Sequence, residues 1–507
     1  MSENANESEF SRGKLIGLIS GLLLFVIFVF NLPGFHMPPE AAATAGIVLM
    51  MACFWVSLCL PIPVTSLLPI VLFPLFGVAS SGATVKYYAN NNIYLFMGGF
   101  IIALAIEKWG LHRRIALKIT TLLGTSPAKV VMGFMCGTAF MSMWISNTAT
   151  AMMMLPIGLA VISETSEIIG KESKFATVLM LGIAYGASVG GIATPIGTPP
   201  NIVFLGQFTK TFPDAPEISF FNWIKVFLPL TVILIPVVWF VLLKVMGLRS
   251  QKIKMGREII RDELKKLGRM DSGEKRILIV FAITAFLWIF RSDIATGLFT
   301  IPGWSRLLPH PGLIHDATVA VFMATILFII PAGKDHPGHF IMDWPTALNL
   351  PWGILLLFGG GFAIAGGFSA SGLDKLIGMA LKPYLIFHPL IIVFMICLLL
   401  TFLTELTSNT ATTAALLPIM GGTAPALGLN PLLLMIPATI SASMAFMLPV
   451  ATPPNAIVFS SGRIKMSEMV RVGLVLNLVI AVIVACFVYY IVLPAWGYSA
   501  SMPVWAQ

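Results

Sequence analysis

Five residues occur twice in this 507-residue chain in the same order, and each copy lies in a hydrophobic setting. Segment 146–150 reads SNTAT, and segment 408–412 repeats it 262 positions later. Ser, Asn and Thr are preferred at helix N-caps, where free backbone N–H groups and about half a positive charge attract anions. Their side-chain oxygens and neighbouring carbonyls also suit a small, hard cation. Each segment is therefore a candidate site for an anion, a cation or both.

A second polar motif is also duplicated. Segment 198–201 reads TPPN, and segment 452–455 repeats it 254 positions later. Proline directly after a Thr cap begins a helix, whereas proline within a helix breaks it. We therefore expect the apolar segment 176–207 to be broken near Gly197-Thr198 and the segment 431–461 near Ala451-Thr452.

Further matches keep the order of these motifs. LFMGGF at 95–100 corresponds to LFGGGF at 357–362, and Gly110-Leu111 to Gly372-Leu373, both at the offset of 262. A lone polar residue in a membrane helix usually bonds to a neighbouring helix, but duplication at corresponding places favours a transport site. Internal repeats with interrupted segments are typical of secondary transporters that bind near the membrane midplane.

The composition is that of a polytopic membrane protein. Hydrophobic residues make up 57% of the chain and charged residues 10%, and the mean hydropathy is +0.92, which excludes a water-soluble multidomain enzyme. Two apolar segments, 130–163 and 384–423, are interrupted by the SNTAT clusters and are predicted to be re-entrant hairpins. We thus expect an all-α protein with about eleven transmembrane helices plus two hairpins in an inverted repeat. The predicted spans are 15–31, 41–60, 62–79, 92–106, 176–207, 221–246, 276–292, 314–332, 352–369, 431–461 and 472–494.

The basic residues predict the orientation. The chain has 31 Lys and Arg against 22 Asp and Glu, a net charge of +9. With the N-terminus in the cytoplasm, 23 of the basic residues fall on inner segments and six on outer ones, as the positive-inside rule requires. We therefore expect a plasma-membrane protein with an extracytoplasmic C-terminus and no nucleic-acid partner. Ten basic residues lie in 247–276, either a cytoplasmic linker or a segment that binds anionic lipid.

Charge is nearly absent from the motifs themselves. Neither SNTAT segment contains Arg or Lys, so a bound dianion would be costly without co-bound cations. This absence predicts Na⁺ coupling. Glu405, three residues before Ser408, is an intramembrane carboxylate and therefore either a functional group or a structural partner of a neighbouring helix.

The remaining motifs do not predict an enzyme. Gly186 to Gly190 matches the GxSxG nucleophile pattern but lies within a hydrophobic helix, where the same residues favour close helix packing. No pair of histidines has metal-ligand spacing, and the five cysteines imply no disulfide framework. We expect no catalytic residues and no cofactor beyond Na⁺ as coupling ion.

With its paired SNT motifs, the chain resembles the divalent anion/sodium symporter family, which imports di- and tricarboxylates or sulfate. The resemblance covers essentially the whole chain and implies a homodimer in which a mobile transport domain moves like an elevator against a fixed scaffold. It divides the chain into a cytoplasmic tail (1–14), scaffold helices (15–127 and 276–383), transport-domain elements (128–246 and 384–494), a cytoplasmic linker (247–275) and an extracytoplasmic tail (495–507).

The resemblance also assigns residues. It gives a first sodium site of Ser142, Ser146, Asn147 and Gly197, and a second of Thr404, Thr407, Asn409 and Ala451. Substrate carboxylates would contact Ser146, Asn147, Thr148, Ser408, Asn409 and Thr410, flanked by Thr198, Thr452 and Pro453. The predicted function is Na⁺-coupled uptake of a C4 dicarboxylate such as succinate, fumarate or malate. A sodium-independent di- or tricarboxylate exchanger and a sulfate/sodium symporter of the same fold are the alternatives.

Overall fold

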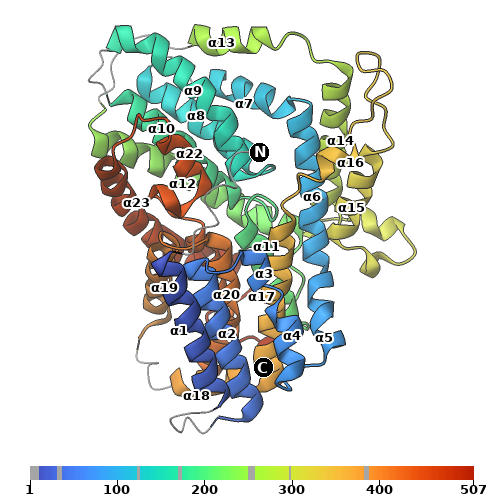
Figure 1. Cartoon of the computed structure of the whole chain (residues 1–507). Coiled ribbons are helices and arrows are strands. Elements are labelled where there is room, and N and C mark those ends of the chain that lie inside the picture. The colour runs from blue at the N-terminus through green and yellow to red at the C-terminus, as the bar shows by residue number, and fades with distance from the viewer. Residues whose placement is uncertain are drawn as a thin grey trace.

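The structure, a computed structural model, describes residues 11–30, 37–122, 126–169, 174–248, 257–295, 299–381 and 387–507. The predicted N-terminal tail up to residue 10, part of the basic linker and Lys382, one of the six basic residues predicted to lie on outer segments, are outside these ranges. Nearly all described elements are helices (Figure 1). The two short strands among them, β1 (Ile294–Ala295) and β2 (Thr300–Ile301), pair antiparallel.

The first half contains the helices that lead to and follow the first SNTAT segment. They are α1 (Arg12–Val29), α2 (Pro39–Ser57), α3 (Ile62–Thr65), α4 (Leu68–Leu75), α5 (Ser81–Val85), α6 (Asn91–Lys108), α7 (Leu111–Leu122), α8 (Pro127–Ser142), α9 (Asn147–Ile169), α10 (Phe175–Gly191), α11 (Pro199–Thr211) and α12 (Phe220–Met246). The linker helix α13 (Arg257–Lys266) follows.

The second half repeats this order. Its helices are α14 (Ser272–Ile289), α15 (Asp316–Leu327), α16 (Trp344–Ala347), α17 (Trp352–Ser371), α18 (Leu373–Leu381), α19 (Pro389–Thr404), α20 (Asn409–Ala426), α21 (Leu432–Ala442), α22 (Pro453–Phe459), α23 (Met466–Phe487) and α24 (Leu493–Ala495). A π-helical turn over Val488–Val492 joins α23 to α24.

Six helical segments of the described chain are long and apolar enough to cross a membrane. They are Arg12–Val29, Pro39–Ser57, Ser81–Lys108, Phe220–Met246, Trp352–Ser371 and Met466–Ala495. Shorter apolar helices occupy five further segments: Ile62–Leu75, Phe175–Gly191, Asp316–Leu327, Pro389–Thr404 and Leu432–Ala442. The helical, apolar character of the chain agrees with a multi-pass membrane protein, while the count of eleven crossings stays a prediction.

The two interrupted segments form helical hairpins. Helices α8 and α9 meet at Met143–Ser146, and α19 and α20 meet at Glu405–Ser408, so each SNTAT segment opens the second arm of its hairpin. Figure 1 shows α8 and α9 in the upper part of the molecule and α19 and α20 in the lower part. The linker helix α13 and the C-terminus likewise lie at opposite ends.

Equivalent helices of the two halves make equivalent contacts. Helix α8 packs against α10, as α19 packs against α21, and the halves interlock because α11 packs against α20 while α22 packs against α9. The expected close packing at the GxxxG segment is confirmed, since a β-carbon on Gly190 would collide with the carbonyl oxygen of Ala139 in α8, and one on Gly186 would lie 3.0 Å from that of Met135. The interlocked pairs bring both hairpin tips to the centre of the fold.

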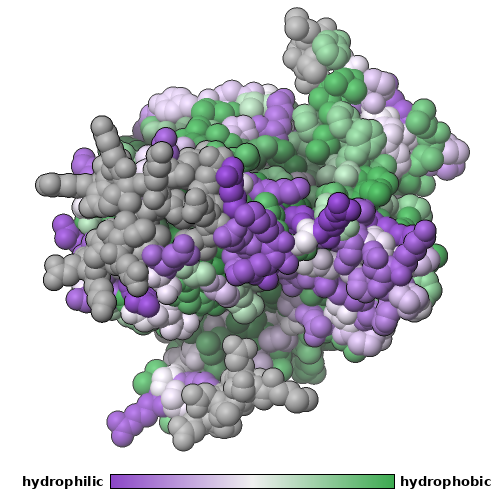
Figure 2. Space-filling view, turned by 90° about the horizontal axis from the view of Figure 1, so that it is seen from above, coloured by the Kyte–Doolittle hydropathy of each residue, from purple (hydrophilic) through white to green (hydrophobic). Residues whose placement is uncertain are grey.

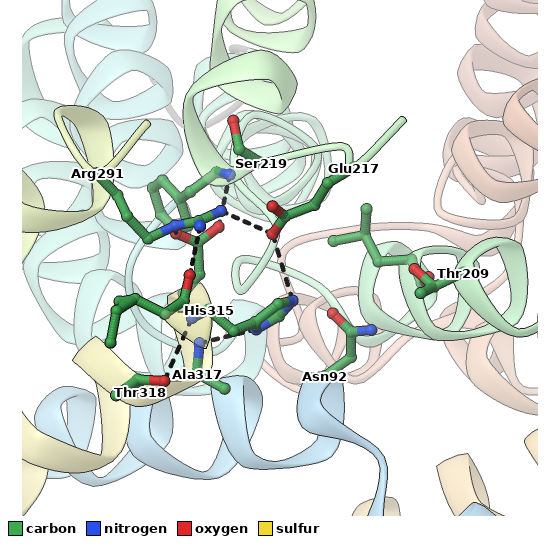
Figure 3. A network of polar contacts seen from close by, with 12 residues as sticks. Asn92, Thr209, Glu217, Ser219, Arg291, His315, Ala317 and Thr318 are labelled. Atoms are coloured by element: carbon green, nitrogen blue, oxygen red, sulfur yellow. Dashed lines mark hydrogen bonds and ion pairs between the residues drawn. The ribbon is translucent and has the colours of Figure 1, made fainter. Parts of the chain in front are cut away.

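Buried ion pairs hold the ends of the helices. Arg114 of α7 pairs with Glu274 of α14 at 2.5 Å, and both side chains are buried. At the other end of α14, Arg291 donates from Nε to Asp316 Oδ1 at 2.5 Å and from Nη2 to Glu217 Oε1 at 2.7 Å. Figure 3 shows Arg291 and His315 both reaching Glu217, which lies in the connection between α11 and α12. This network joins that connection to α14 and α15.

Polar residues gather on the end of the molecule that carries α13. Figure 2, viewed onto this end, shows hydrophilic residues across the middle of the face and hydrophobic residues towards its upper-right margin. A polar cap beside apolar helices is what a membrane-embedded protein exposes where its helices leave the bilayer.

Candidate binding site

Four helix beginnings line one cavity of about 910 Å³. They are the first residues of α9 and α20 at the hairpin tips, and those of α11 and α22 after the breaks. The lining includes twelve of the residues that the family resemblance assigns to the site: Ser146, Asn147, Thr148, Gly197, Thr198, Thr407, Ser408, Asn409, Thr410, Ala451, Thr452 and Pro453. The first turns of α9 and α20 point free N–H groups and a partial positive charge at the cavity, whereas α11 and α22 begin with proline pairs, which lack an N–H, and contribute the partial charge of the helix end. The arrangement can therefore hold an anion without a basic side chain.

Both breaks occur where the TPPN motifs predict a new helix. Helix α10 ends at Gly191 and α11 begins at Pro199 with Thr198 as its N-cap. Helix α21 ends at Ala442 and α22 begins at Pro453 with Thr452 as its N-cap. Segments 192–198 and 443–452, which lie outside the α-helices and include a short 3-10 helix at Pro449–Ala451, are thereby left to supply backbone groups to the cavity.

Ser142 and Thr404 do not line the cavity but hold residues that do. Each is fully buried, one turn before its hairpin tip. Ser142 Oγ donates to Asn147 Oδ1, and Thr404 Oγ1 lies 2.6 Å from Asn409 Oδ1 and 2.9 Å from the Ala442 carbonyl oxygen. The two halves thus fix the asparagine of each SNTAT segment by the same contact.

Oxygen atoms crowd around Gly197 in the first half. A β-carbon added to Gly197 would lie 2.5 Å from the carbonyl oxygen of Gly191 and 3.0 Å from that of Ser142. One added to Gly191 would lie 2.7 Å from Asn147 Oδ1. Carbonyl and amide oxygens gathered where no side chain fits are the donor set that a hard cation such as Na⁺ prefers.

A second pair of asparagines stabilises the breaks. Asn201 Nδ2 donates to the carbonyls of Gly191 at 3.1 Å and Thr194 at 2.8 Å. Asn455 Nδ2 donates to the corresponding carbonyls, Ala445 at 3.1 Å and Leu448 at 3.0 Å. These carbonyls lie at or beyond the ends of α10 and α21, where the regular helical hydrogen bonds stop, and a buried unpaired carbonyl is unfavourable. The Asn of each TPPN motif is therefore a structural clamp, a role that the sequence analysis did not assign.

Glu405 has a structural partner in the second half. Its carboxylate accepts from the backbone N–H groups of Phe446 at 2.7 Å, Met447 at 2.9 Å and Leu448 at 3.0 Å, and from Asn477 Nδ2 at 2.8 Å. The side chain is 3% exposed. Of the two readings that the sequence left open for Glu405, this geometry supports structural pairing, because four donors satisfy the buried charge.

Thr407 bonds within its own hairpin. Its hydroxyl lies 2.9 Å from the Leu403 carbonyl and 2.5 Å from the Thr412 hydroxyl. In the first hairpin, Ser146 Oγ accepts from the Ala149 N–H at 3.1 Å, as an N-cap does. Both tips are therefore held in place by their own hydroxyl groups.

One residue of the cavity was missed by the sequence analysis. Glu107, in the last turn of α6, lines the cavity, but the predicted span ended at residue 106. Among the described residues that line the cavity, Glu107 is the one ionisable side chain. The described chain also contains no cluster of His, Cys, Asp or Glu suited to a transition metal.

Comparison with known proteins decides the family. Residues 14–496 match the family described as the sodium:sulfate symporter transmembrane region. The chain belongs to this family. It is 40% identical to the sodium-dependent dicarboxylate transporter SdcS of Staphylococcus saprophyticus and 41% identical to SdcS of a Staphylococcus aureus strain. Both alignments cover 99% of this chain and 96% of the relative.

Solved structures of low sequence identity share the fold. The YdaH transporter of Alcanivorax borkumensis has a TM-score of 0.58 at 13% identity, covering 94% of this chain and 98% of that one. MtrF of Neisseria gonorrhoeae has a TM-score of 0.58 at 12% identity, covering 94% and 95%. These two similarities bear on the fold alone.

Proposed function

We propose that this chain is a secondary active transporter that couples uptake of a C4 dicarboxylate, such as succinate, fumarate or malate, to Na⁺. The family membership and the sodium-dependent dicarboxylate transporters at about 40% identity over the whole chain support this proposal. The observation that carries it in the structure is the convergence of four helix N-termini and both SNTAT segments on one cavity.

The electrostatics of the cavity favour cation coupling. No Lys, Arg or His occurs among the described residues that line it, so partial charges of helix N-termini are the positive groups that the protein itself offers. A dianion removed from water needs more compensation than these provide. Na⁺ ions at the two oxygen-rich tips, around Asn147 and Asn409, would supply it.

The assigned residues follow the repeat. The first sodium site would use Ser142, Ser146, Asn147 and Gly197, and the second Thr404, Thr407, Asn409 and Ala451. The SNT residues of both tips would bind the two substrate carboxylates. Hydroxyl and backbone N–H groups hydrogen-bond to the carboxylates of a substrate and not to the carbon atoms between them. The same site would therefore accommodate several C4 dicarboxylates.

Transport would proceed by an elevator motion within a homodimer. The hairpins and broken helices (128–246 and 384–494) would move as the transport domain against a scaffold of 15–127 and 276–383. Sodium would bind first and order the tips, the dianion would follow, and the loaded domain would then cross. Each positive charge carried inward in excess of the substrate charge contributes about 2.3 kcal/mol per 100 mV of membrane potential.

Uptake into proteoliposomes tests the proposal. Purified protein should accumulate labelled succinate when Na⁺ is outside, and replacement of Na⁺ by choline should abolish uptake. Uptake that is unchanged in choline but requires internal substrate would instead identify a sodium-independent exchanger. A thermal-shift screen of dicarboxylates, citrate and sulfate, each with and without Na⁺, would identify the substrate, because a ligand that binds the folded state raises the unfolding temperature.

A further inference from the structure

The side chain of Glu107 is unexpected in a cavity proposed to bind a dianion, because the two would repel each other. Glu107 is partly buried and lines the same cavity as both SNTAT segments. Its position in the last turn of α6 is electrostatically unfavourable, because the C-terminal end of a helix carries partial negative charge. Like-charge repulsion would also weaken dicarboxylate binding.

Neighbouring basic residues do not neutralise Glu107 in the described part of the chain. Lys108 pairs with Asp343 at 2.6 Å, while Arg113 and Arg114 pair with carboxylates of α13 and α14. No ion pair of the Glu107 side chain is found among the described residues. The Lys108 contact instead fixes the end of α6 and with it the place of Glu107 on the cavity wall.

The cavity reaches one end of the scaffold. Besides the tips, it is lined by Leu58 directly after α2 and Ile62 at the start of α3, by Glu107 at the end of α6, and by Asn349 before α17. The distribution of basic residues predicts that all of these connections face the cytoplasm. In this conformation Glu107 therefore lies on the cytoplasmic path to the site.

The internal repeat makes this charge asymmetric. At the offset of 262, the residue that corresponds to Glu107 is Ser369 in α17. Because the halves are inverted, Ser369 would occupy the equivalent place on the path from the outside. At these corresponding positions, the first half thus carries a carboxylate and the second a neutral hydroxyl.

We propose that Glu107, when its carboxyl group is ionised, sets the difference in dicarboxylate affinity between the two faces by weakening binding of the dianion from the cytoplasmic side. The inference rests on the proposed function. A single charge acting on a dianion across a cavity of this size through partly aqueous medium changes affinity by about three- to tenfold. The ratio of internal to external dicarboxylate at equilibrium is still set by the Na⁺ gradient. A change in affinity on one face is therefore accompanied by a compensating change in the equilibrium between the inward- and outward-facing states.

The test measures half-saturating succinate concentrations on each face of oriented proteoliposomes. Glu107→Gln should lower the cytoplasmic value three- to tenfold and leave the external value unchanged. The gain should shrink as ionic strength rises, because salt screens the charge. Glu107→Asp, which keeps the charge, should behave as the wild type.

A substitution at the corresponding residue of the second half provides a second test in case Glu107→Gln does not assemble. Ser369→Glu should raise the external half-saturating concentration and leave the cytoplasmic one unchanged. Equal changes on both faces, no change, or a change insensitive to ionic strength in either variant would overturn the proposal. Succinate uptake by the wild type that does not require Na⁺ would instead refute the proposed function.

Discussion

Replacement of Glu405 by Gln tests the link between a buried carboxylate and the second sodium site. Glu405 Oε1 accepts from Phe446, Met447 and Asn477, and Oε2 accepts from Leu448 at 3.0 Å. Gln keeps the shape of the side chain but replaces one oxygen by an NH₂ group. If the Gln oxygen takes the place of Oε1 and keeps its three donors, the NH₂ group takes the place of Oε2 and faces the Leu448 N–H, so that two donors oppose each other.

The cost follows from these contacts. An unsatisfied buried N–H costs about 1–3 kcal/mol. The remaining bonds change from charge-assisted to neutral, which roughly halves their strength. Together these losses amount to about 2–5 kcal/mol, concentrated on the segment 443–452 that carries Ala451. If about 2 kcal/mol of this is needed to order the sodium site, the Na⁺ concentration for half-maximal uptake rises roughly 30-fold.

Two measurements check this prediction. Thermal unfolding in detergent, with and without Na⁺, should show a lower midpoint for Glu405→Gln, and the Na⁺ dependence of succinate uptake should shift as stated. Glu40→Gln, at an exposed carboxylate in the first turn of α2, is the matched control and should leave both unchanged. A Glu405→Gln protein with the wild-type unfolding midpoint and Na⁺ dependence would refute the argument.

Three further predictions concern other contacts. Asn409→Ala should abolish Na⁺-dependent uptake while the protein still elutes as an assembled species in gel filtration; normal uptake would remove the site assignment. Arg291→Met should destabilise the fold by about 3–5 kcal/mol, because it leaves the buried Asp316 carboxylate without its cation, and an unchanged midpoint in thermal denaturation would contradict this. The hydrogen bond from Lys108 lowers the pKa of Asp343 to about 2. Because this pKa is lowered on folding, the ion pair stabilises the fold fully above the pKa of the unfolded carboxyl group, and the stabilisation is lost only as the pH falls towards 2. Asp343→Asn should therefore lower the free energy of unfolding by the same small amount, under about 1 kcal/mol, at pH 5 and at pH 8. A clear difference between the two pH values would disprove this prediction.

The hairpin tips and helix breaks were predictable because local chemistry dictates them. Thr198 and Thr452 each precede a proline pair, and the helices α11 and α22 begin at the first proline of each pair as expected. The close approach at Gly190 likewise followed from spacing, since only a residue without a side chain lets two helix backbones meet.

Other features depend on partners far apart in the sequence. Glu405 is 41 residues from Phe446 and 72 from Asn477, so its role could not be read from its own segment. The predicted span that ended at residue 106 left out Glu107, because a charged residue at the end of an apolar run looks like a solvent-exposed boundary.

The sequence by itself determined that this is a helical membrane protein of two repeated halves, and which residues stand at its helix caps. These properties depend on composition, on proline and on the order of a few polar residues, all of which act within one or two helical turns. Only the tertiary structure decided that Ser142 and Thr404 hold Asn147 and Asn409, that Glu405 satisfies an open backbone segment, and that Glu107 lines the cavity. Such contacts arise when helices pack, because packing of the two interlocked halves sets which distant side chains share a buried space.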